Sequence, residues 1–204
     1  MKPSKILPDD SIAIGTLDIR NNPRALILLN FFGLILLGLS GWLVLRAAFW
    51  LHPIQANSAF SLQIRSGMEG LRWVLAALII TIGMLVIHEA IHGLFFWLFT
   101  GSRPKFGIGP GYAFAAAPEW YLPRNLYFMI GVAPLILMTL AGLLILAVAP
   151  PTWFMSLLVF ISFNISGSVG DLAVVIWLMK QPPTCLARDC GHFVTLYRTN
   201  RDQA

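Results

Sequence analysis

Charged residues are scarce in this chain. Only 11% of its 204 residues are Asp, Glu, Lys or Arg, whereas 57% are hydrophobic, a balance that excludes an ordinary soluble globular domain. The 14 basic residues outnumber the 9 acidic ones, but they lie in short segments between apolar runs and do not cluster as a nucleic-acid surface would require. We therefore expect a membrane protein that is surrounded by the lipid bilayer and has no nucleic-acid partner.

Cysteine is rarer still, because Cys185 and Cys190 are the only two in the sequence. Together with His192 they are too few for a metal knuckle, which needs more ligands at tighter spacing, so we expect reduced thiols. The first 24 residues mix acidic and basic side chains and lack the apolar core of a cleaved signal peptide. The first apolar run is therefore expected to stay in the membrane as an anchor.

Long apolar runs dominate the rest of the sequence. A spanning helix needs about 20 mostly apolar residues, because the hydrocarbon core is about 30 Å thick and each residue advances about 1.5 Å. Four runs qualify, at residues 25–45, 73–99, 126–148 and 153–179. Pro150 and Pro151 predict a tight helical hairpin between the last two. The expected fold is an all-α membrane protein with four transmembrane helices and a short irregular or β-hairpin segment between helices 2 and 3.

The expected organisation has three parts: a cytoplasmic N-terminal segment (1–24), a four-helix transmembrane domain (25–179) and a cytoplasmic C-terminal tail (180–204). Basic residues set the orientation, since they favour the cytoplasmic side of a membrane. With the N-terminus inside, eleven of them lie inside and three outside. The eleven are Lys2, Lys5, Arg20, Arg24, Arg103, Lys105, Arg124, Lys180, Arg188, Arg198 and Arg201, and the three are Arg46, Arg65 and Arg72. Both termini are therefore expected in the cytoplasm.

A His-Glu-x-x-His motif in the second apolar run begins at His88 and ends at His92. Residues four apart in a helix lie about 40° apart around its axis and one turn along it, so both imidazoles can reach one metal ion. Glu89 can then take a proton from a metal-activated water. Three ionisable groups are costly in hydrocarbon, and a divalent cation is the simplest compensating partner. The motif predicts a Zn²⁺ site. The alternative is a cluster of polar residues that pack between helices and hydrogen-bond one another.

Asp171 is the only carboxylate in the fourth apolar run, and catalytic zinc usually takes three protein ligands. In the expected topology His88 and His92 lie roughly 10 to 17 Å from the cytoplasmic end of their helix, and Asp171 lies about 12 Å from the end of its own. The three side chains can therefore meet at one depth. Glu119 and His52 are weaker candidates for the third ligand, because both fall outside the expected spans.

One face of the fourth run carries polar and small residues. Asn164, Gly167, Ser168 and Asp171 are spaced i, i+3, i+4 and i+7, as residues on one helical face are. Small residues there let helices approach closely, and Asn164 and Ser168 can bond across the interface. A packing stripe and a functional face are both compatible with this pattern.

These residues resemble the motifs of the site-2 protease class of intramembrane zinc metallopeptidases. More closely, they resemble a bacterial family of small membrane proteins described as putative zincin peptidases. The resemblance covers residues 73–179. His88, Glu89 and His92 match the first motif of the class, and Asn164 and Asp171 match the second, except that a glycine precedes the aspartate and no proline lies between. The resemblance implies a peptidase of the bacterial plasma membrane that acts on a membrane protein or peptide.

The glycine-rich residues 106–112 are similar in placement to a segment that forms strands beside the active site in site-2 proteases. A strand edge there could hold an unwound substrate by backbone pairing. A plain reentrant or surface loop is the alternative.

The expected function is hydrolysis of peptide bonds by metal-activated water, with Glu89 as the general base and Asn164 orienting a substrate carbonyl or stabilising the oxyanion. Two other classes of function stay open. One is a zinc-binding scaffold or chaperone without catalysis. The other is a metal or proton transporter, which would need polar residues along the helices on both sides of the site. The second run before Thr81 and the third run offer few.

Overall fold

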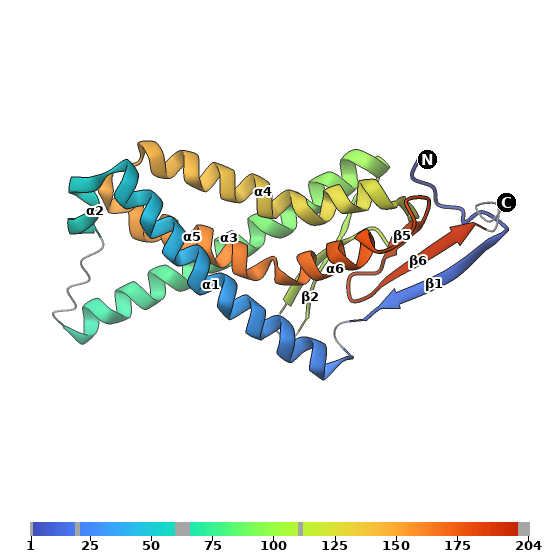
Figure 1. Cartoon of the computed structure of the whole chain (residues 1–204), viewed down its shortest axis with the longest axis horizontal. Helices are drawn as coiled ribbons and strands as arrows, with labels where there is room; N and C mark the ends of the chain where they lie inside the picture. The colour runs from blue at the N-terminus through green and yellow to red at the C-terminus, as the bar shows by residue number, and fades with distance from the viewer. Residues whose placement is uncertain (1, 19–20, 60–65, 110–111, 200–204) are drawn as a thin grey trace. The chain divides into compact units, whose positions relative to one another are not determined.

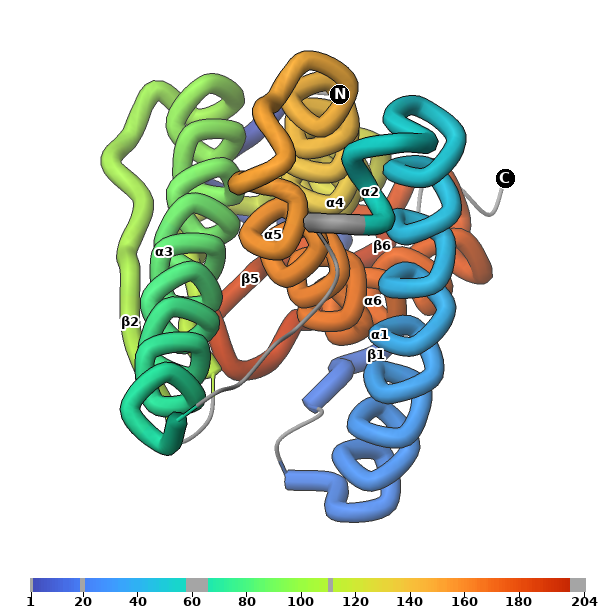
Figure 2. The backbone as a smooth tube through the Cα atoms, turned by 90° about the vertical axis from the view of Figure 1, so that its left-hand side faces the viewer, coloured from blue at the N-terminus to red at the C-terminus, as the bar shows by residue number. Residues whose placement is uncertain are grey.

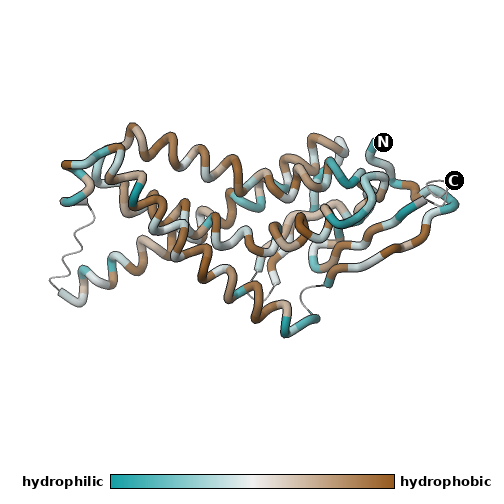
Figure 3. The backbone as a smooth tube through the Cα atoms, in the orientation of Figure 1, coloured by the Kyte–Doolittle hydropathy of each residue, from teal (hydrophilic) through white to brown (hydrophobic). Residues whose placement is uncertain are grey.

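The computed structural model describes residues 2–18, 21–59, 66–109 and 112–199. Among these residues, four helical spans are long and apolar enough to cross a membrane. They are α1 (Pro23–Leu51), α3 (Gly67–Thr100), α4 (Arg124–Val148) and the span Pro151–Met179. Figure 3 shows that hydrophobic residues dominate these helices and that hydrophilic residues gather in the segments that connect them. The expectation of four long apolar helices is confirmed.

Many large apolar side chains on these helices face outward. Ile79 is 70% exposed, Val86 63% and Leu144 71%. Surface of this kind is unfavourable in water but not in hydrocarbon. The exposed helix faces are therefore suited to contact with lipid.

Two connections between the long helices contain short helices. They are α2 (Pro53–Ala59) and the 3₁₀ helix η1 (Pro151–Trp153). The 3₁₀ helix follows directly on Pro150, which has no N–H to continue the preceding helix. The tight connection that was predicted at the two prolines is confirmed.

The fourth span contains two α-helices instead of the single helix that we predicted. They are α5 (Phe154–Gly167) and α6 (Val169–Met179). Ser168 lies at the break, where its hydroxyl and its N–H both donate to the carbonyl of Asn164, at 2.8 and 3.0 Å. Serine that bonds back to its own helix and neighbouring glycines both weaken a helix locally. The break places Asp171 in the first turn of α6.

A β-hairpin connects α3 to α4. Its strands β2 (Lys105–Gly109) and β3 (Tyr112–Ala116) pair antiparallel. The expected segment between helices 2 and 3 was either irregular or a β-hairpin, and the structure has the hairpin. The part of that expectation that concerns residues 110 and 111 lies outside the described residues.

The remaining described strands form one antiparallel sheet with the order β1-β6-β5-β4 (Figure 1). The strands are β1 (Ser11–Leu17), β4 (Leu122–Pro123), β5 (Leu186–Asp189) and β6 (Val194–Thr199). We predicted no strands in segments 1–24 and 180–204, yet the two segments pair through β1 and β6. Val194, Thr195 and Tyr197 are typical strand formers, but this short signal is weak beside the long apolar runs.

The sheet joins three segments that the expected topology places on one side of the membrane: the one before α1, the one between α3 and α4, and the one after α6. Ser4 and Tyr121 add two backbone hydrogen bonds between the first two segments, at 3.1 and 2.8 Å. Strands that pair with one another must lie on the same side of a bilayer. A strand that entered the hydrocarbon would expose backbone N–H and C=O groups that have no hydrogen-bond partner there. The pairing therefore agrees with the expected topology, in which two spans separate the first segment from the second and two more separate the second from the third.

The chain forms two compact units. Unit 1 comprises Met1–Asn30, Glu89–Pro134 and Gly170–Ala204, and unit 2 comprises Phe31–His88 and Leu135–Val169. Each unit has its own hydrophobic core.

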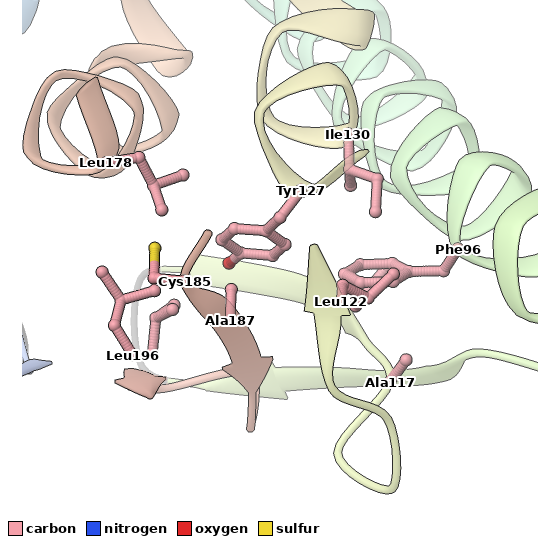
Figure 4. Packing of buried hydrophobic residues seen from close by; sticks show 11 residues of the cluster. Phe96, Ala117, Leu122, Tyr127, Ile130, Leu178, Cys185, Ala187 and Leu196 are labelled. Atoms are coloured by element: carbon pink, nitrogen blue, oxygen red, sulfur yellow. The ribbon is translucent and has the colours of Figure 1, made fainter. Parts of the chain in front are cut away.

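The core of unit 1 lies between helices and the sheet. Figure 4 shows Tyr127 of α4 and Leu178 of α6 above Ala187 and Leu196, which come from β5 and β6. Both strand residues are fully buried. The hydrophobic core of unit 2 consists of Val44, Ala48, Ala56, Leu146, Ala149, Phe154, Leu157 and Ile161.

Candidate metal centre

The second half of α3 carries the His-Glu-x-x-His motif. His88 and His92 are four residues apart in one unbroken helix, so their side chains leave the same face one turn apart. Both histidines are buried, at 6% and 7% exposure, and Glu89 is half-buried. The two histidines therefore lie on one buried helical face.

Asn164 of α5 holds His88. Its Oδ1 accepts a hydrogen bond from Nδ1 of His88 at 3.1 Å, and its Nδ2 donates to Oγ1 of Thr139 in α4 at 3.3 Å. Because an amide oxygen can only accept, Nδ1 of His88 carries the proton and Nε2 keeps the lone pair that a metal requires. Asn164 was predicted to contact substrate, and that role stays a prediction. The contact it makes is with His88.

His92 is held in the same way by a different acceptor. Its Nδ1 donates to the backbone carbonyl of Ile130 in α4 at 3.0 Å. A carbonyl oxygen cannot donate, so the proton is again on Nδ1 and the lone pair on Nε2. Both histidines are therefore set in the tautomer in which Nε2 can bind a metal ion.

Asp171 completes the group. It lies in the first turn of α6, where the free N–H groups of the helix favour a carboxylate, and its Oδ1 is 3.4 Å from Nε2 of His92. Within the described part of the chain, one group of histidine, cysteine and carboxylate side chains could hold a metal ion. It consists of His88, His92 and Asp171, whose candidate ligand atoms lie within 4.8 Å of one another. His88 belongs to the residue range of unit 2, but the unbroken helix fixes its place relative to His92.

The donor set fits a zinc ion. Two imidazole nitrogens and one carboxylate oxygen are ligands that zinc takes in catalytic sites, where a fourth position stays open. Bonds of about 2.0–2.2 Å to one ion place neighbouring ligand atoms about 3–4 Å apart, and the 3.4 Å between His92 and Asp171 is of this size. The residues present therefore fit Zn²⁺ in kind, and His92 and Asp171 are already at the spacing of zinc ligands.

A cavity of about 610 Å³ in unit 1 is lined by Glu89, His92 and Asp171. Its other walls come from α1, α4, β3 and the turn between β5 and β6. Pockets of about 300–1,000 Å³ are typical of sites for small ligands and short peptide segments. The described residues that line this cavity include three carboxylates and neither Lys nor Arg. A cation or a positively charged group would therefore be favoured inside it.

The third of these carboxylates, Asp189, lies at the end of β5. Its Oδ2 accepts a hydrogen bond from the Tyr127 hydroxyl at 2.8 Å, and its Oδ1 accepts one from the N–H of Gly191 at 2.7 Å. Burial raises the pKa of the Asp189 carboxyl above its ordinary value, although these two bonds act in the opposite direction. We did not predict a role for Asp189 or Tyr127. The Asp-x-Gly sequence, which is typical of an Asx turn, was the available signal.

The β2–β3 hairpin lies directly beside the motif helix, and Figure 2 shows β2 alongside α3. A Cβ atom at Gly93 would lie 2.4 Å from Cζ of Phe106, so glycine lets the Phe106 ring of β2 lie against the turn that carries His92. Residues Tyr112–Ala115 of β3 line the cavity. The ring of Phe114 in β3 also lies against Gly191, in the turn between β5 and β6. The φ of Gly191 is +87°, a value that suits glycine.

The two weaker candidates for a metal ligand have other partners. Glu119 is exposed and accepts a hydrogen bond from Nζ of Lys105 at 3.2 Å. This bond and the lysine charge lower the pKa of Glu119. His52 contacts the carbonyl of Leu146 through Nε2 at 3.0 Å.

The cysteines lie apart from the candidate ligands. Cys185 is fully buried in the core of unit 1 and points toward Leu178 (Figure 4). Cys190 is half-buried in the turn between β5 and β6, and His192 in the same turn lines the cavity. Burial raises the pKa of both thiols, which disfavours the reactive thiolate form.

A protein-family model described as putative zincin peptidase (DUF3267) matches residues 81–186, which are 106 of the 204 residues. The matched segment includes His88, Glu89, His92, Asn164 and Asp171. Searches among curated proteins and among solved structures found no match. Since the family model covers more than half of the chain, the chain belongs to the putative zincin peptidase family.

Proposed function

We propose that the protein is an intramembrane zinc metallopeptidase that hydrolyses peptide bonds of membrane-associated polypeptides. The observation that carries this proposal is the group formed by His88, His92 and Asp171, with Glu89 of the same motif at the wall of the adjoining cavity. Membership of the zincin peptidase family supports the same chemistry. The four long apolar helices support a membrane location.

His88 and His92 would hold Zn²⁺ through Nε2, and Asp171 through a carboxylate oxygen. When bound, the ion would polarise the scissile carbonyl and lower the pKa of water to about 7, which makes hydroxide available at neutral pH. Asn164 and the Ile130 carbonyl keep the two imidazoles in the required tautomer and orientation. Such supporting bonds are a usual part of zinc sites.

Glu89 acts as the general base. It follows His88 in the helix and lines the cavity, so its carboxylate can reach a water molecule in the cavity. A carboxylate oxygen of Glu89 accepts a proton as this water attacks the substrate carbonyl. The same carboxyl group then delivers the proton to the leaving amine.

The substrate is an extended polypeptide segment that lies along β3. Among the described strands, β3 pairs only with β2, and Tyr112–Ala115 line the cavity. An extended chain can form backbone hydrogen bonds with such a strand edge, which brings one of its amides next to Glu89 and His92. Polypeptides embedded in the bilayer are the expected source, because the reacting groups lie within a long apolar helix.

The proposed membrane is the bacterial plasma membrane, with both termini in the cytoplasm. The antiparallel pairing of β1 with β6 supports placing the two termini on one side. The excess of basic residues in the segments on that side supports the cytoplasm as that side.

The function is tested by measuring zinc content and cleavage in the same preparations. We expect purified wild-type protein to bind about one equivalent of Zn²⁺ and Glu89→Gln to bind it equally, because Glu89 is outside the ligand set. Membrane fragments quantified by mass spectrometry should decrease in cells that carry Glu89→Gln. A general base typically contributes about 10²–10⁴-fold to the rate, so turnover should fall by at least that amount.

Two results would contradict the proposal in different ways. Zinc binding with identical fragments in wild-type and Glu89→Gln cells would indicate a scaffold without catalysis. Wild-type protein without zinc would remove the metal site itself. Glu119→Gln is the matched control, because it neutralises an exposed carboxylate that lies outside the cavity lining.

A further inference from the structure

A proline stands inside α4, four residues after the carbonyl that holds His92. In an α-helix the N–H of each residue donates to the carbonyl four residues earlier. Pro134 has no N–H, so it cannot donate to the carbonyl of Ile130. This carbonyl accepts instead from Nδ1 of His92 at 3.0 Å. Ile130, Pro134 and His92 are all buried, and a buried carbonyl that is left without a partner is costly.

We propose that Pro134 is a positioning residue for the metal site: it reserves the Ile130 carbonyl for His92. The proposal rests on the proposed zinc site. With Nδ1–H donating to Ile130, the lone pair of His92 is on Nε2, the nitrogen that faces Asp171 at 3.4 Å. A residue with an N–H at position 134 would bond the same carbonyl along the helix axis. It would thereby weaken the bond by which the Ile130 carbonyl sets the His92 ring.

A second histidine in the chain is bonded in the same pattern. Nε2 of His52 contacts the carbonyl of Leu146 at 3.0 Å, and the residue four positions after Leu146 is Pro150. The helical bonding continues through Ala149, whose N–H donates to Ile145 at 2.8 Å, and it stops at the proline. At the end of α4, the carbonyl to which Pro150 cannot donate is thus bonded by the His52 imidazole. Inside α4, the carbonyl to which Pro134 cannot donate is bonded by the His92 imidazole.

The two sites make a matched pair for experiment. His92 belongs to the candidate metal group, whereas His52 does not. Their prolines belong to different compact units. A change at Pro150 should therefore alter the bond of His52 and leave the metal site as it is, and a change at Pro134 should do the reverse.

The first test measures both variants with and without metal. We expect Pro134→Ala to bind Zn²⁺ about 10–100-fold more weakly than wild type in competition with a chelator, the usual loss when a supporting bond to a zinc histidine is removed. Pro150→Ala should bind Zn²⁺ like wild type. In zinc-free protein labelled with ¹⁵N-histidine, Pro134→Ala should change the ring signals of His92, and Pro150→Ala should change only those of His52. Histidine-to-glutamine variants assign the four histidine signals.

A second variant separates the missing N–H from the shape of the proline ring. Lactic acid at position 134 replaces the amide with an ester, so the position still has no N–H but no longer has a ring. We expect this variant to keep wild-type Zn²⁺ affinity and wild-type His92 signals. Circular dichroism checks that each variant keeps its helices, which alanine favours over proline.

Two outcomes would overturn the inference. Pro134→Ala could leave both the Zn²⁺ affinity and the His92 signals unchanged, or the lactic acid variant could lose as much affinity as alanine, which would assign the effect to the ring. Wild-type protein that binds no zinc would refute the proposed function instead. The ¹⁵N signals of the zinc-free protein would still decide whether Pro134 positions His92.

Discussion

The two compact units of the chain differ in where they place ionisable groups. Eight of the nine acidic residues belong to unit 1, and only Glu69 belongs to unit 2. The cavity and its three carboxylates are part of unit 1, whereas the buried polar side chains of the described part of unit 2 are His88, Asn164 and three serines. The long helices pass through both units, so the contrast appears within single helices. In α3 no ionisable residue lies between Arg72 and His88.

This difference shows how a small membrane protein can accommodate reactive groups. An ionisable side chain in hydrocarbon is costly by itself, but the cost falls when several such groups satisfy one another. His92 contacts both Asp171 and the Ile130 carbonyl, and Asp189 accepts bonds from Tyr127 and Gly191. Most of these groups belong to unit 1, and apart from His88 the described part of unit 2 buries apolar and uncharged polar side chains.

The largest expected effect is a loss of Zn²⁺ affinity in a variant of the candidate metal site, compared with a variant of the apolar core. Asp171→Ala should weaken Zn²⁺ binding by more than about 100-fold, since losing a ligand costs more than losing a supporting bond. Ile161→Ala removes a fully buried side chain from the core of unit 2. It should lower the free energy of unfolding by about 2–5 kcal/mol and leave the Zn²⁺ affinity unchanged. Chelator competition and thermal unfolding of the zinc-free protein measure the two quantities.

The comparison would fail if Ile161→Ala weakened zinc binding as much as Asp171→Ala. The metal site would then depend on the packing of unit 2. Zinc-free Asp171→Ala should lose less stability than Ile161→Ala, because the aspartate is half-buried and leaves only a small void, although His92 loses its contact at 3.4 Å.

Much of this arrangement follows from local rules. The length of the apolar runs was sufficient to predict the four long helices, because the thickness of a bilayer sets the length of a span. His88, Glu89 and His92 were predictable as a group, because helical periodicity alone puts four-apart residues on one face. Asp171 was predictable from two observations taken together. It is the one carboxylate of its apolar run, and its expected depth in the membrane matches that of the two histidines.

The parts that were not predicted depend on contacts between distant segments. The β1–β6 pair joins the two ends of the chain, and its strand signal is short and lies beside long apolar runs. The roles of Tyr127 and Asp189 require α4 and β5 to meet. The break at Ser168 depends on one side-chain bond to its own helix, which competes weakly with helix propensity and leaves little trace in a hydrophobicity pattern.

An intermediate effect is expected at the residue that holds His88. Asn164→Leu removes the acceptor of the His88 Nδ1 bond while nearly keeping the side-chain volume. The affinity for Zn²⁺ should fall by about 10–100-fold, which chelator competition would measure. Thr139→Val is the control, because it removes the outer partner of Asn164 and leaves the bond to His88 in place. An Asn164→Leu protein with full Zn²⁺ affinity but no peptidase activity would instead favour the predicted contact with substrate.

The smallest expected effect concerns Tyr127 and Asp189 at the cavity wall of unit 1. Hydrogen bonds, and not a metal ion, are the partners of the Asp189 carboxyl group there. Tyr127→Phe removes the hydroxyl that donates to Asp189 and should lower the free energy of unfolding by about 1 kcal/mol. The loss should depend on pH. Burial holds the pKa of Asp189 above the ordinary value of 3.8, so the folded state retains its proton longer than the unfolded state as pH rises. Stability therefore declines between the ordinary value and the raised one.

The Tyr127 bond opposes that decline, because it favours the ionised carboxylate. Without it the pKa of Asp189 rises further, so the stability of Tyr127→Phe should continue to fall at higher pH, and its difference from wild type should grow from acid to neutral pH. His92 and Asp171 also face Asp189 electrostatically, so the measurement is made on zinc-free protein by thermal unfolding across pH. In an Asp189→Asn background the cost of Tyr127→Phe should no longer change over the acid range. A cost that is equal at every pH in both backgrounds would mean that the Tyr127 hydroxyl does not favour the ionised form of Asp189.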